Sequence, residues 1–216
     1  MPPARRPLSS AGPTARQRTA RAPQEVRIIG GQWKRTRLPV PDLPGLRPTP
    51  DRVRETLFNW LGQDLTGWRV VDAFAGTGAL GLEAASRGAS EVWLVEQDGG
   101  QADALRALVR KLQAEGVRVE RANGLTVLQR FAGTGLDLVL LDPPFDAGLH
   151  EKAVAASVPA LAPHGMLYLE SPTAWTDAML EPWGLAVWRH LRAGAVHAHL
   201  LRRADQDASV PQAAAS

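Results

Sequence analysis

Short apolar runs that alternate with amphipathic segments are the feature that most constrains how this chain can fold. Each run is rich in Val, Leu or Ile, and the segments between the first five have helical spacing. This alternation predicts a doubly wound parallel α/β sheet with helices on both faces. The last two runs flank Gly194 and predict a closing antiparallel pair. The seven expected strands are 68–74, 91–96, 117–120, 136–141, 165–170, 185–191 and 196–201.

Composition divides the chain into four parts. Residues 1–24 are rich in Pro, Ser, Thr, Ala and Arg and have few side chains that could pack, so we expect a disordered basic arm. Residues 25–48 are expected to form a small β-hairpin with its turn at Gly30-Gly31, followed by a proline-rich connector. Residues 49–204 hold the alternating pattern and form the principal domain. Residues 205–216 are polar and rich in alanine, and we expect a disordered tail.

The first helix of the principal domain has a distinct start. Thr49 can cap this helix, and Pro50 suits the first helical position. Its apolar positions share one face as far as Leu61, and we expect Arg52 and Arg54 to lie off that face. Further helices are expected up to Gly88 and over 101–115, 124–131 and 151–161.

Positive charge is concentrated near the N-terminus. Residues 1–37 hold nine Lys or Arg and one acid, whereas the remainder holds 16 basic and 21 acidic residues. A basic arm on a mildly acidic body suits a polyanionic partner, although a solvated, disordered tail has the same composition. No apolar run approaches the roughly 20 residues that span a bilayer, and the N-terminus lacks a secretory signal. A cytoplasmic location is therefore expected.

The expected hairpin is basic and carries an aromatic side chain. Its cations are Arg27, Lys34, Arg35 and Arg37, and its aromatic residue is Trp33. Cations that contact phosphates, together with a ring on which a base can stack, are typical of RNA-binding surfaces. The alternative is an edge hairpin whose charges are simply solvated.

A glycine-rich turn follows the first parallel strand. Gly76, Gly78 and Gly81 have the spacing of a nucleotide-binding fingerprint, and Glu96 at the end of the next strand is placed to bind a ribose diol. NAD enzymes share this pattern. Asp72, however, would repel a pyrophosphate and suits a ligand with an ammonium group, and the chain is too short for a second nucleotide-binding half. These features favour S-adenosylmethionine.

One more polar residue completes the expected cofactor site. Asn123 follows the third strand, where its amide could hydrogen-bond to the adenine edge; an Asn-Gly turn is the alternative explanation. The candidate cofactor-binding residues are Asp72, Phe74, Gly76, Gly78, Glu96 and Asn123.

The segment Asp142-Pro143-Pro144-Phe145 ends an apolar strand with an acid, two prolines and an aromatic ring. The carboxyl edge of such a sheet is where α/β proteins bind ligands. The Asp142 carboxylate and the Pro143 carbonyl could both accept from an exocyclic amine and orient its lone pair for attack on a methyl group. Phe145 could stack on the base. The alternative is a sharp strand exit without chemistry.

Cysteine and histidine further limit which reactions the chain could catalyse. The chain has no cysteine, so methylation of a pyrimidine carbon through a cysteine adduct is excluded and nitrogen is the expected acceptor. His197 and His199 share a face of one expected strand, but no acidic or cysteine partner lies near them in the sequence. We therefore expect ordinary strand residues and no metal.

Several of these motifs together resemble a known family. They are Arg47-Pro48-Thr49 with residues 52–61, residues 72–83, Asp142-Pro143-Pro144-Phe145 and the opening segment 27–33. In this order they resemble the RsmD family of bacterial small-subunit ribosomal RNA guanine-N2 methyltransferases. The similarity covers roughly residues 26–203.

The resemblance implies a Rossmann-like class I methyltransferase fold, with S-adenosylmethionine as donor and N2 of guanine 966 of 16S rRNA as acceptor. The substrate would be a partly assembled small subunit, and we expect the protein to act as a monomer. By motif, Asp142, Pro143 and Phe145 take the base, and Arg47 and Arg52 border the RNA. The arm before residue 25 departs from the pattern, and its role stays open.

Two other functional classes compete with this interpretation. One is an amino-methyltransferase that acts on DNA adenine or on protein glutamine, because both use a similar Pro-Pro-aromatic exit. A DNA enzyme would be expected to carry a separate base-reading domain, and no segment between the expected strands is long enough. The other is a non-catalytic rRNA-binding assembly factor that retains a cofactor pocket.

Overall fold

The computed structural model describes residues 25–40, 49–144 and 148–209, with side chains described as far as residue 206. The expected arm 1–24, the connector from residue 41 to 48, Phe145 and the end of the tail from residue 210 therefore lie outside the described residues. Within the three described ranges, every helix is too short or too polar to cross a bilayer.

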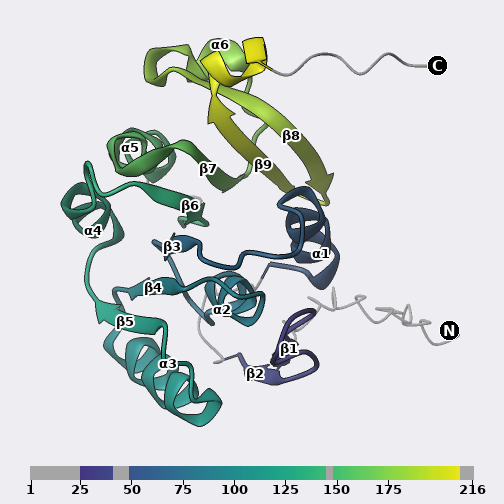
Figure 1. Ribbon diagram of the computed structural model, residues 1–216, viewed down its shortest axis with the longest axis vertical. Helices are drawn as coiled ribbons and strands as arrows, with labels where there is room; N and C mark the ends of the chain where they lie inside the picture. Colours follow the sequence, from purple (N-terminus) through teal and green to yellow (C-terminus); the bar gives the residue numbers. More distant parts are fainter. Residues whose placement is uncertain (1–24, 41–48, 145–147, 210–216) are drawn as a thin grey trace, which may run out of the picture.

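The described residues form a seven-stranded sheet with the order β5-β4-β3-β6-β7-β9-β8, and a separate two-stranded hairpin, β1 with β2. The first five strands of the large sheet are parallel, whereas β9 is antiparallel to both β7 and β8 (Figure 1). The strands are β3 Arg69–Asp72, β4 Glu91–Glu96, β5 Val117–Arg121, β6 Leu136–Leu141, β7 Leu161–Ser171, β8 Leu185–Ala193 and β9 Val196–Arg203.

Helices cover both faces of the sheet. The hairpin, α1 and α2 lie on the side away from α4 and α5 (Figure 1). A first apolar cluster, around Leu82, Leu94 and Leu140, packs under α1, α2, α3 and the hairpin, and a second, around Leu128 and Leu169, packs under α4, α5 and α6. The helices are α1 Asp51–Trp60, α2 Ala79–Ser86, α3 Gly99–Leu112, α4 Gly124–Arg130, α5 Leu149–Ser157 and α6 Asp177–Leu180, with short 3-10 helices η1 Val158–Ala160, η2 Glu181–Trp183 and η3 Ala204–Ser209.

The central strands are apolar because both of their faces are covered. Leu138 and Leu140 point into the first cluster, whereas Val139 and Leu141 point into the second, and all four are fully buried. Each such side chain contributes about 1.5 to 3 kcal/mol to folding. The predicted doubly wound sheet with a closing antiparallel pair is thus confirmed, and β4 and β6 have the predicted bounds.

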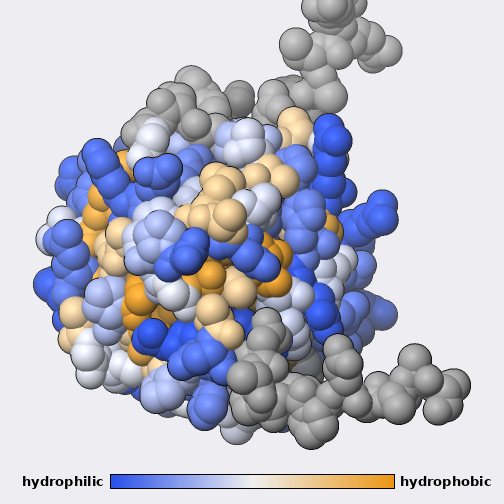
Figure 2. Space-filling view, turned by 90° about the horizontal axis from the view of Figure 1, so that it is seen from above, coloured by the Kyte–Doolittle hydropathy of each residue, from blue (hydrophilic) through white to orange (hydrophobic). Residues whose placement is uncertain are grey.

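The surface outside these clusters is mainly polar. Figure 2 shows a face on which hydrophilic side chains surround small apolar areas. Among the described residues, Met179 is the large apolar side chain that is exposed. The expected tail from residue 205 begins inside the 3-10 helix η3, so the chain continues as helix there and not as irregular tail.

The hairpin differs from the prediction. Its strands are only β1 Glu25–Arg27 and β2 Arg37–Pro39, and a longer segment joins them. The predicted turn at Gly30-Gly31 is wrong, because these glycines pack against the end of α2. The Gly30 amide donates to Glu83, and a Cβ on Gly31 would lie 1.7 Å from the Ser86 carbonyl oxygen. Close approach to a neighbouring helix, and not hairpin geometry, requires glycine at position 31.

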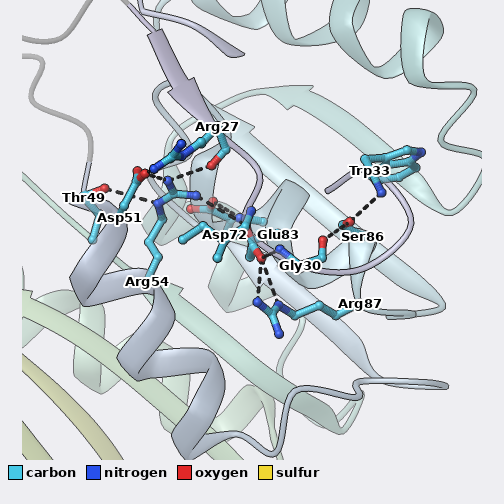
Figure 3. Close-up of polar contacts among 12 residues, drawn as sticks. Arg27, Gly30, Trp33, Thr49, Asp51, Arg54, Asp72, Glu83, Ser86 and Arg87 are labelled. Carbon is cyan, nitrogen blue, oxygen red and sulfur yellow. Dashed lines mark hydrogen bonds and ion pairs between the residues drawn. The ribbon is translucent and has the colours of Figure 1, made fainter. Parts of the chain in front are cut away.

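The start of α1 also differs. Thr49 does not cap the helix; its hydroxyl donates to Glu170 Oε1 at 2.6 Å. Arg54 was expected off the apolar face but is completely buried. Burial is possible because its guanidinium has four partners: the carboxylates of Asp51 and Glu83 and the carbonyls of Arg27 and Thr49 (Figure 3).

The buried carboxylate of Glu83 completes this connection. It accepts from the amides of Ile29 and Gly30, both at 2.7 Å, from Arg54 and from Arg87. In Figure 3, Arg54 reaches Glu83 from α1, Gly30 reaches it from the hairpin segment and Arg87 reaches it from the end of α2 itself. Arg54 and Glu83 therefore fasten the hairpin to the principal domain.

Replacing Arg54 with Ala should lower the free energy of unfolding by about 3 kcal/mol or more, because breaking a buried ion pair leaves its partners uncompensated. Arg52→Ala is the matched control, since Arg52 is exposed on the same helix and should change stability by no more than about 0.5 kcal/mol. Urea unfolding of both variants measures the difference. Equal losses would contradict the role given to Arg54.

Candidate active site

Three acids end neighbouring strands at the carboxyl edge of the sheet. Asp72 is the last residue of β3, Asp142 follows β6, and Glu170 lies one residue before the end of β7. The register pairs Asp72 with Leu140 and Leu141 with Leu169, so Asp142 and Glu170 are side by side. Because side chains alternate along a strand, all three acids point to the face of α1 and α2.

Burial dominates the electrostatics of this cluster. It raises the pKa of Asp72 from the ordinary 3.8 to about 7, against the opposing hydrogen bond from the Gly81 amide. Burial likewise raises the pKa of Asp142 well above its usual range, and the neighbouring charges of Glu170 and Asp72 raise it further. The pKa of Glu170 is also raised by burial. Close carboxylates in a desolvated site share protons, which is typical of functional sites.

The glycine turn brings the start of α2 against Asp72. Gly78 precedes α2 with φ of 77°, and a Cβ on Gly81 would lie 2.3 Å from Leu94. This close packing lets the Gly81 amide donate to Asp72 Oδ2 at 2.9 Å. The other oxygen, Oδ1, is buried and meets the distance and angle limits of a hydrogen bond with no described donor, although the nearby Phe74 amide also lowers the pKa of this carboxyl. An unpartnered buried acceptor suits a ligand that brings a donor, such as an ammonium group.

Glu96 and Asn123 occupy the neighbouring strand ends. Glu96 Oε2 accepts from the Gly76 amide at 2.9 Å, so this carboxylate holds the glycine turn against the end of β4. Asn123 caps α4, with Oδ1 accepting from the amides of Leu125 and Thr126. Phe74 is half-buried against the second cluster. The structure thus gives Asn123 and Glu96 local roles, and their contacts with a cofactor stay predictions.

The expected base-binding segment lies beside these acids. Asp142 is half-buried, Pro143 is buried and Pro144 is exposed. Asp142 is thus partly exposed as a residue, while burial of its carboxyl group is the largest cause of its raised pKa. Phe145, the predicted stacking residue, lies outside the described residues.

Part of the predicted RNA-binding set lies near this edge. Arg27 pairs with Asp51 at the start of α1, and Arg37, directly across the hairpin, pairs with Glu25. Their side chains are 68% and 76% exposed, so these ion pairs contribute little to stability and both cations can contact a ligand. Arg52 is exposed on α1.

The other predicted RNA-binding residues lie away from the carboxyl edge of the sheet. The Trp33 amide donates to the Ser86 hydroxyl at 3.0 Å, and Ser86 ends α2 at the opposite edge of the sheet. Trp33 is half-buried and lines a hollow of about 260 Å³ with Ala89 and Gly116. In Figure 3 it lies away from Arg27. Lys34 and Arg35 are exposed next to Trp33, so the structure separates these residues from Arg27, and Arg47 lies outside the described residues.

A third histidine joins the predicted pair. Ring nitrogens of His190, His197 and His199 lie within 4.8 Å of one another. Both nitrogens of His199 already have partners, because Nε2 accepts from the Trp175 amide and Nδ1 lies 3.3 Å from the Leu169 carbonyl oxygen. The His190 and His197 rings stack and are joined by a 2.9 Å hydrogen bond. Packing of the closing strands accounts for these side chains.

Sequence reasoning missed three residues of the site. Glu170 is 3% exposed, and its Oε1 accepts from the hydroxyls of Thr49 and Tyr168 at 2.6 and 2.8 Å. The signal for Glu170 was present, because it ends an apolar strand as Asp72 and Asp142 do. Nothing in the local sequence indicates that Thr49 and Tyr168 converge on it, since 121 positions separate Thr49 from Glu170.

The strand order, the glycine turn and the acids at the carboxyl edge together define a class I methyltransferase. Solved structures agree with this assignment. A putative methyltransferase, yhhF, from Escherichia coli superposes with a TM-score of 0.71 at 40% identity, covering 83% of this chain and 98% of that one. A putative methylase from Haemophilus influenzae has a TM-score of 0.68 at 32% identity, with the same coverage of both chains.

The chain belongs to the family described as Conserved hypothetical protein 95, the RsmD family, whose model matches residues 26–202. Ribosomal RNA small subunit methyltransferase D of Escherichia coli K12 is 41% identical over 187 residues, which is 86% of this chain and 93% of the relative. The Haemophilus influenzae protein of the same name is 37% identical over 184 residues, 79% of this chain and 95% of the relative. The predicted family and fold are confirmed.

Replacing Asp72 with Asn should make the folded protein less sensitive to rising pH. The pKa of Asp72 is about 7 in the folded protein and 3.8 in the ordinary case, so the folded state binds the proton more tightly. The resulting stability is present at low pH and is lost as pH rises through about 7. Asp72→Asn should therefore recover up to about 4 kcal/mol at pH 8 relative to the parent.

Urea unfolding at pH 5 and pH 8 measures the part of this loss that falls between those pH values, which is about 2.6 kcal/mol for pKa values of about 7 and 3.8. Asp103→Asn is the control, because the Asp103 side chain is 77% exposed and its removal should leave the pH dependence unchanged. An equal loss of stability between pH 5 and pH 8 in Asp72→Asn and in the parent would contradict the burial of a titrating acid.

Proposed function

We propose that this protein transfers a methyl group from S-adenosylmethionine to the exocyclic N2 of a guanine in the RNA of the small ribosomal subunit. The observation that carries the proposal is the position of Asp142. This acid is half-buried beside two further carboxylates, at the edge of the sheet where the glycine turn opens. The family relatives named as rRNA small subunit methyltransferases support RNA as the substrate.

Residues around the glycine turn would hold the cofactor. The buried, unpartnered Oδ1 of Asp72 suits the ammonium group. Glu96 would bind the ribose and Asn123 the adenine, with Phe74, Gly76 and Gly78 completing the wall. When bound, S-adenosylmethionine supplies an electrophilic methyl carbon that the amine lone pair attacks, while the electrons of the S–C bond remain on sulfur.

The strand exit would hold the base. The Asp142 carboxylate and the Pro143 carbonyl accept from the amine, which directs its lone pair away from the ring system and toward the methyl carbon. Pro143 has no N–H to donate, and the pairing of β6 with β7 ends at Leu141, so the Pro143 carbonyl lies beyond the ladder. Phe145 would stack on the base after it leaves its own stack.

The exposed cations near this edge would contact phosphates. Arg27, Arg37 and Arg52 surround the start of α1, and Arg47 precedes it in sequence. Trp33, Lys34 and Arg35 would form a second contact farther along the RNA, since they lie at the opposite edge of the sheet. A partly assembled subunit, in the cytoplasm, would expose such an extended surface.

The substrate can be tested directly with labelled S-adenosylmethionine. We expect label to enter small subunits that lack the mark, with little or none in DNA or in protein, and mapping should place it on one guanine. Comparing the label in naked 16S rRNA with the label in small subunits shows whether ribosomal proteins are needed in the substrate. Label only in DNA or only in a protein glutamine would overturn the proposal, and no transfer to any substrate would favour an assembly factor.

Asp142→Ala should lose at least about 100-fold in the rate of methyl transfer, the scale of a positioned acid-base group. Cofactor affinity, measured by calorimetry, should stay close to that of the parent because Asp72 and Glu96 are unchanged. Asp103→Asn again serves as the control for loss of one acid from the surface. Parental turnover in Asp142→Ala would remove Asp142 from the reaction.

A further inference from the structure

Glu170 is a buried carboxylate that the proposed reaction has not yet used. Its Oε1 accepts from two neutral hydroxyls, those of Thr49 and Tyr168. No described residue forms an ion pair with it. The nearest cation of the buried core, Arg54, attracts it but is already paired with Asp51 and Glu83.

A glutamine at this position could accept the same two hydrogen bonds without a charge. Burying a carboxylate without a paired cation costs free energy, so Glu170 does something beyond accepting from Thr49 and Tyr168. The neighbouring carboxylate of Asp142 suggests a role for the charge of Glu170. Asp142 and Glu170 directly follow the pair Leu141 and Leu169 of β6 and β7, and the charge of Glu170 acts on the Asp142 carboxyl.

We propose that Glu170 is a positioning residue for methyl transfer. The negative charge of Glu170 disfavours a negative charge on Asp142, and this makes the Asp142 carboxylate a stronger acceptor for the proton that the amine loses. This inference rests on the proposed function. It assigns no contact between Glu170 and the base, because Glu170 acts through Asp142.

The proton balance shows why a charged neighbour helps. When the amine nitrogen gains a methyl group, one of its two protons must leave. An ionised Asp142 takes this proton and becomes neutral, which removes one negative charge from the cluster. Because Asp142 is half-buried at the edge of the sheet, we expect the proton to pass from it to water, which restores the carboxylate.

Groups from several elements surround the pair. Asp72 faces it from β3, Tyr168 from β7 and Arg54 from α1, and His150 of α5 hydrogen-bonds to the Glu170 backbone. Burial is the largest cause that raises the pKa of Asp142, and the charge of Glu170 is the next. Asp72 acts in the same direction, so a test must separate Glu170 from Asp72.

The test is a titration of the cofactor-free protein by NMR, with aspartate labelled with ¹³C at Cγ. The Asp142 resonance is assigned by its loss in Asp142→Asn. In Glu170→Gln the midpoint of the Asp142 titration should fall by about one pH unit or more, because strongly coupled acids differ by at least this amount. Asp103→Asn, exposed on α3, should leave the midpoint in place. An unchanged midpoint in a folded Glu170→Gln protein would overturn the inference.

A second measurement does not depend on whether the Glu170→Gln variant folds. In the parent, the Asp142 resonance should titrate in two steps, because its proton is coupled to that of a neighbour. Asp72→Asn should keep both steps if Glu170 is that neighbour. A single step in Asp72→Asn would assign the coupling to Asp72 and overturn the inference.

Single-turnover rates on unmethylated small subunits separate this inference from the proposed function. The acidic limb of the parent's pH–rate profile should move to lower pH in Glu170→Gln, since Asp142 then ionises more readily. A limb that does not move, in a parent that methylates rRNA, would overturn the role of Glu170 alone. A parent that shows coupled titration but no transfer to rRNA would overturn the proposed function instead.

Discussion

The buried pair of Arg54 and Glu83 is the interaction on which the arrangement of this protein depends. Through it, three separate parts of the chain meet: the hairpin, α1 and α2. A guanidinium suits this position because its planar donors can reach carbonyls and carboxylates at the same time. Since α2 begins at the glycine turn and ends against Gly31, one short helix connects the proposed cofactor end of the site to the hairpin.

At the carboxyl edge of the sheet, the requirements of stability and of the proposed function oppose each other. Asp72, Asp142 and Glu170 lie close together and mostly out of water, which destabilises their charged forms and the folded protein at neutral pH. Such a cluster would be removed if stability were the only requirement. The cluster is consistent with the proposed site, which would attract an ammonium group at one end and accept a proton at the other.

In the proposed function, the hairpin would extend the RNA-binding surface along the protein. Arg27 and Arg37 stand near the start of α1, whereas Trp33 packs at the far end of α2. An RNA that contacted both regions would have to run along the face formed by the hairpin and α2. Recognition by shape over a folded RNA surface is consistent with such separated contacts, and it differs from a compact groove that reads one short strand.

The sequence by itself determined the features that depend on neighbouring positions. Strand β6 could be placed because its apolar run is bounded by Gly135 and by the prolines after Asp142. The glycine turn could be placed because the spacing of its glycines allows α2 to pack closely against β3. Motif order then identified the family. The tertiary structure alone decided what depends on distant partners: that Arg54 is buried, that Thr49 donates to Glu170 and that Gly31 meets Ser86. The physical reason is that burial of a polar group is decided by the groups that pair with it, and in this fold those groups come from elements far apart in the chain.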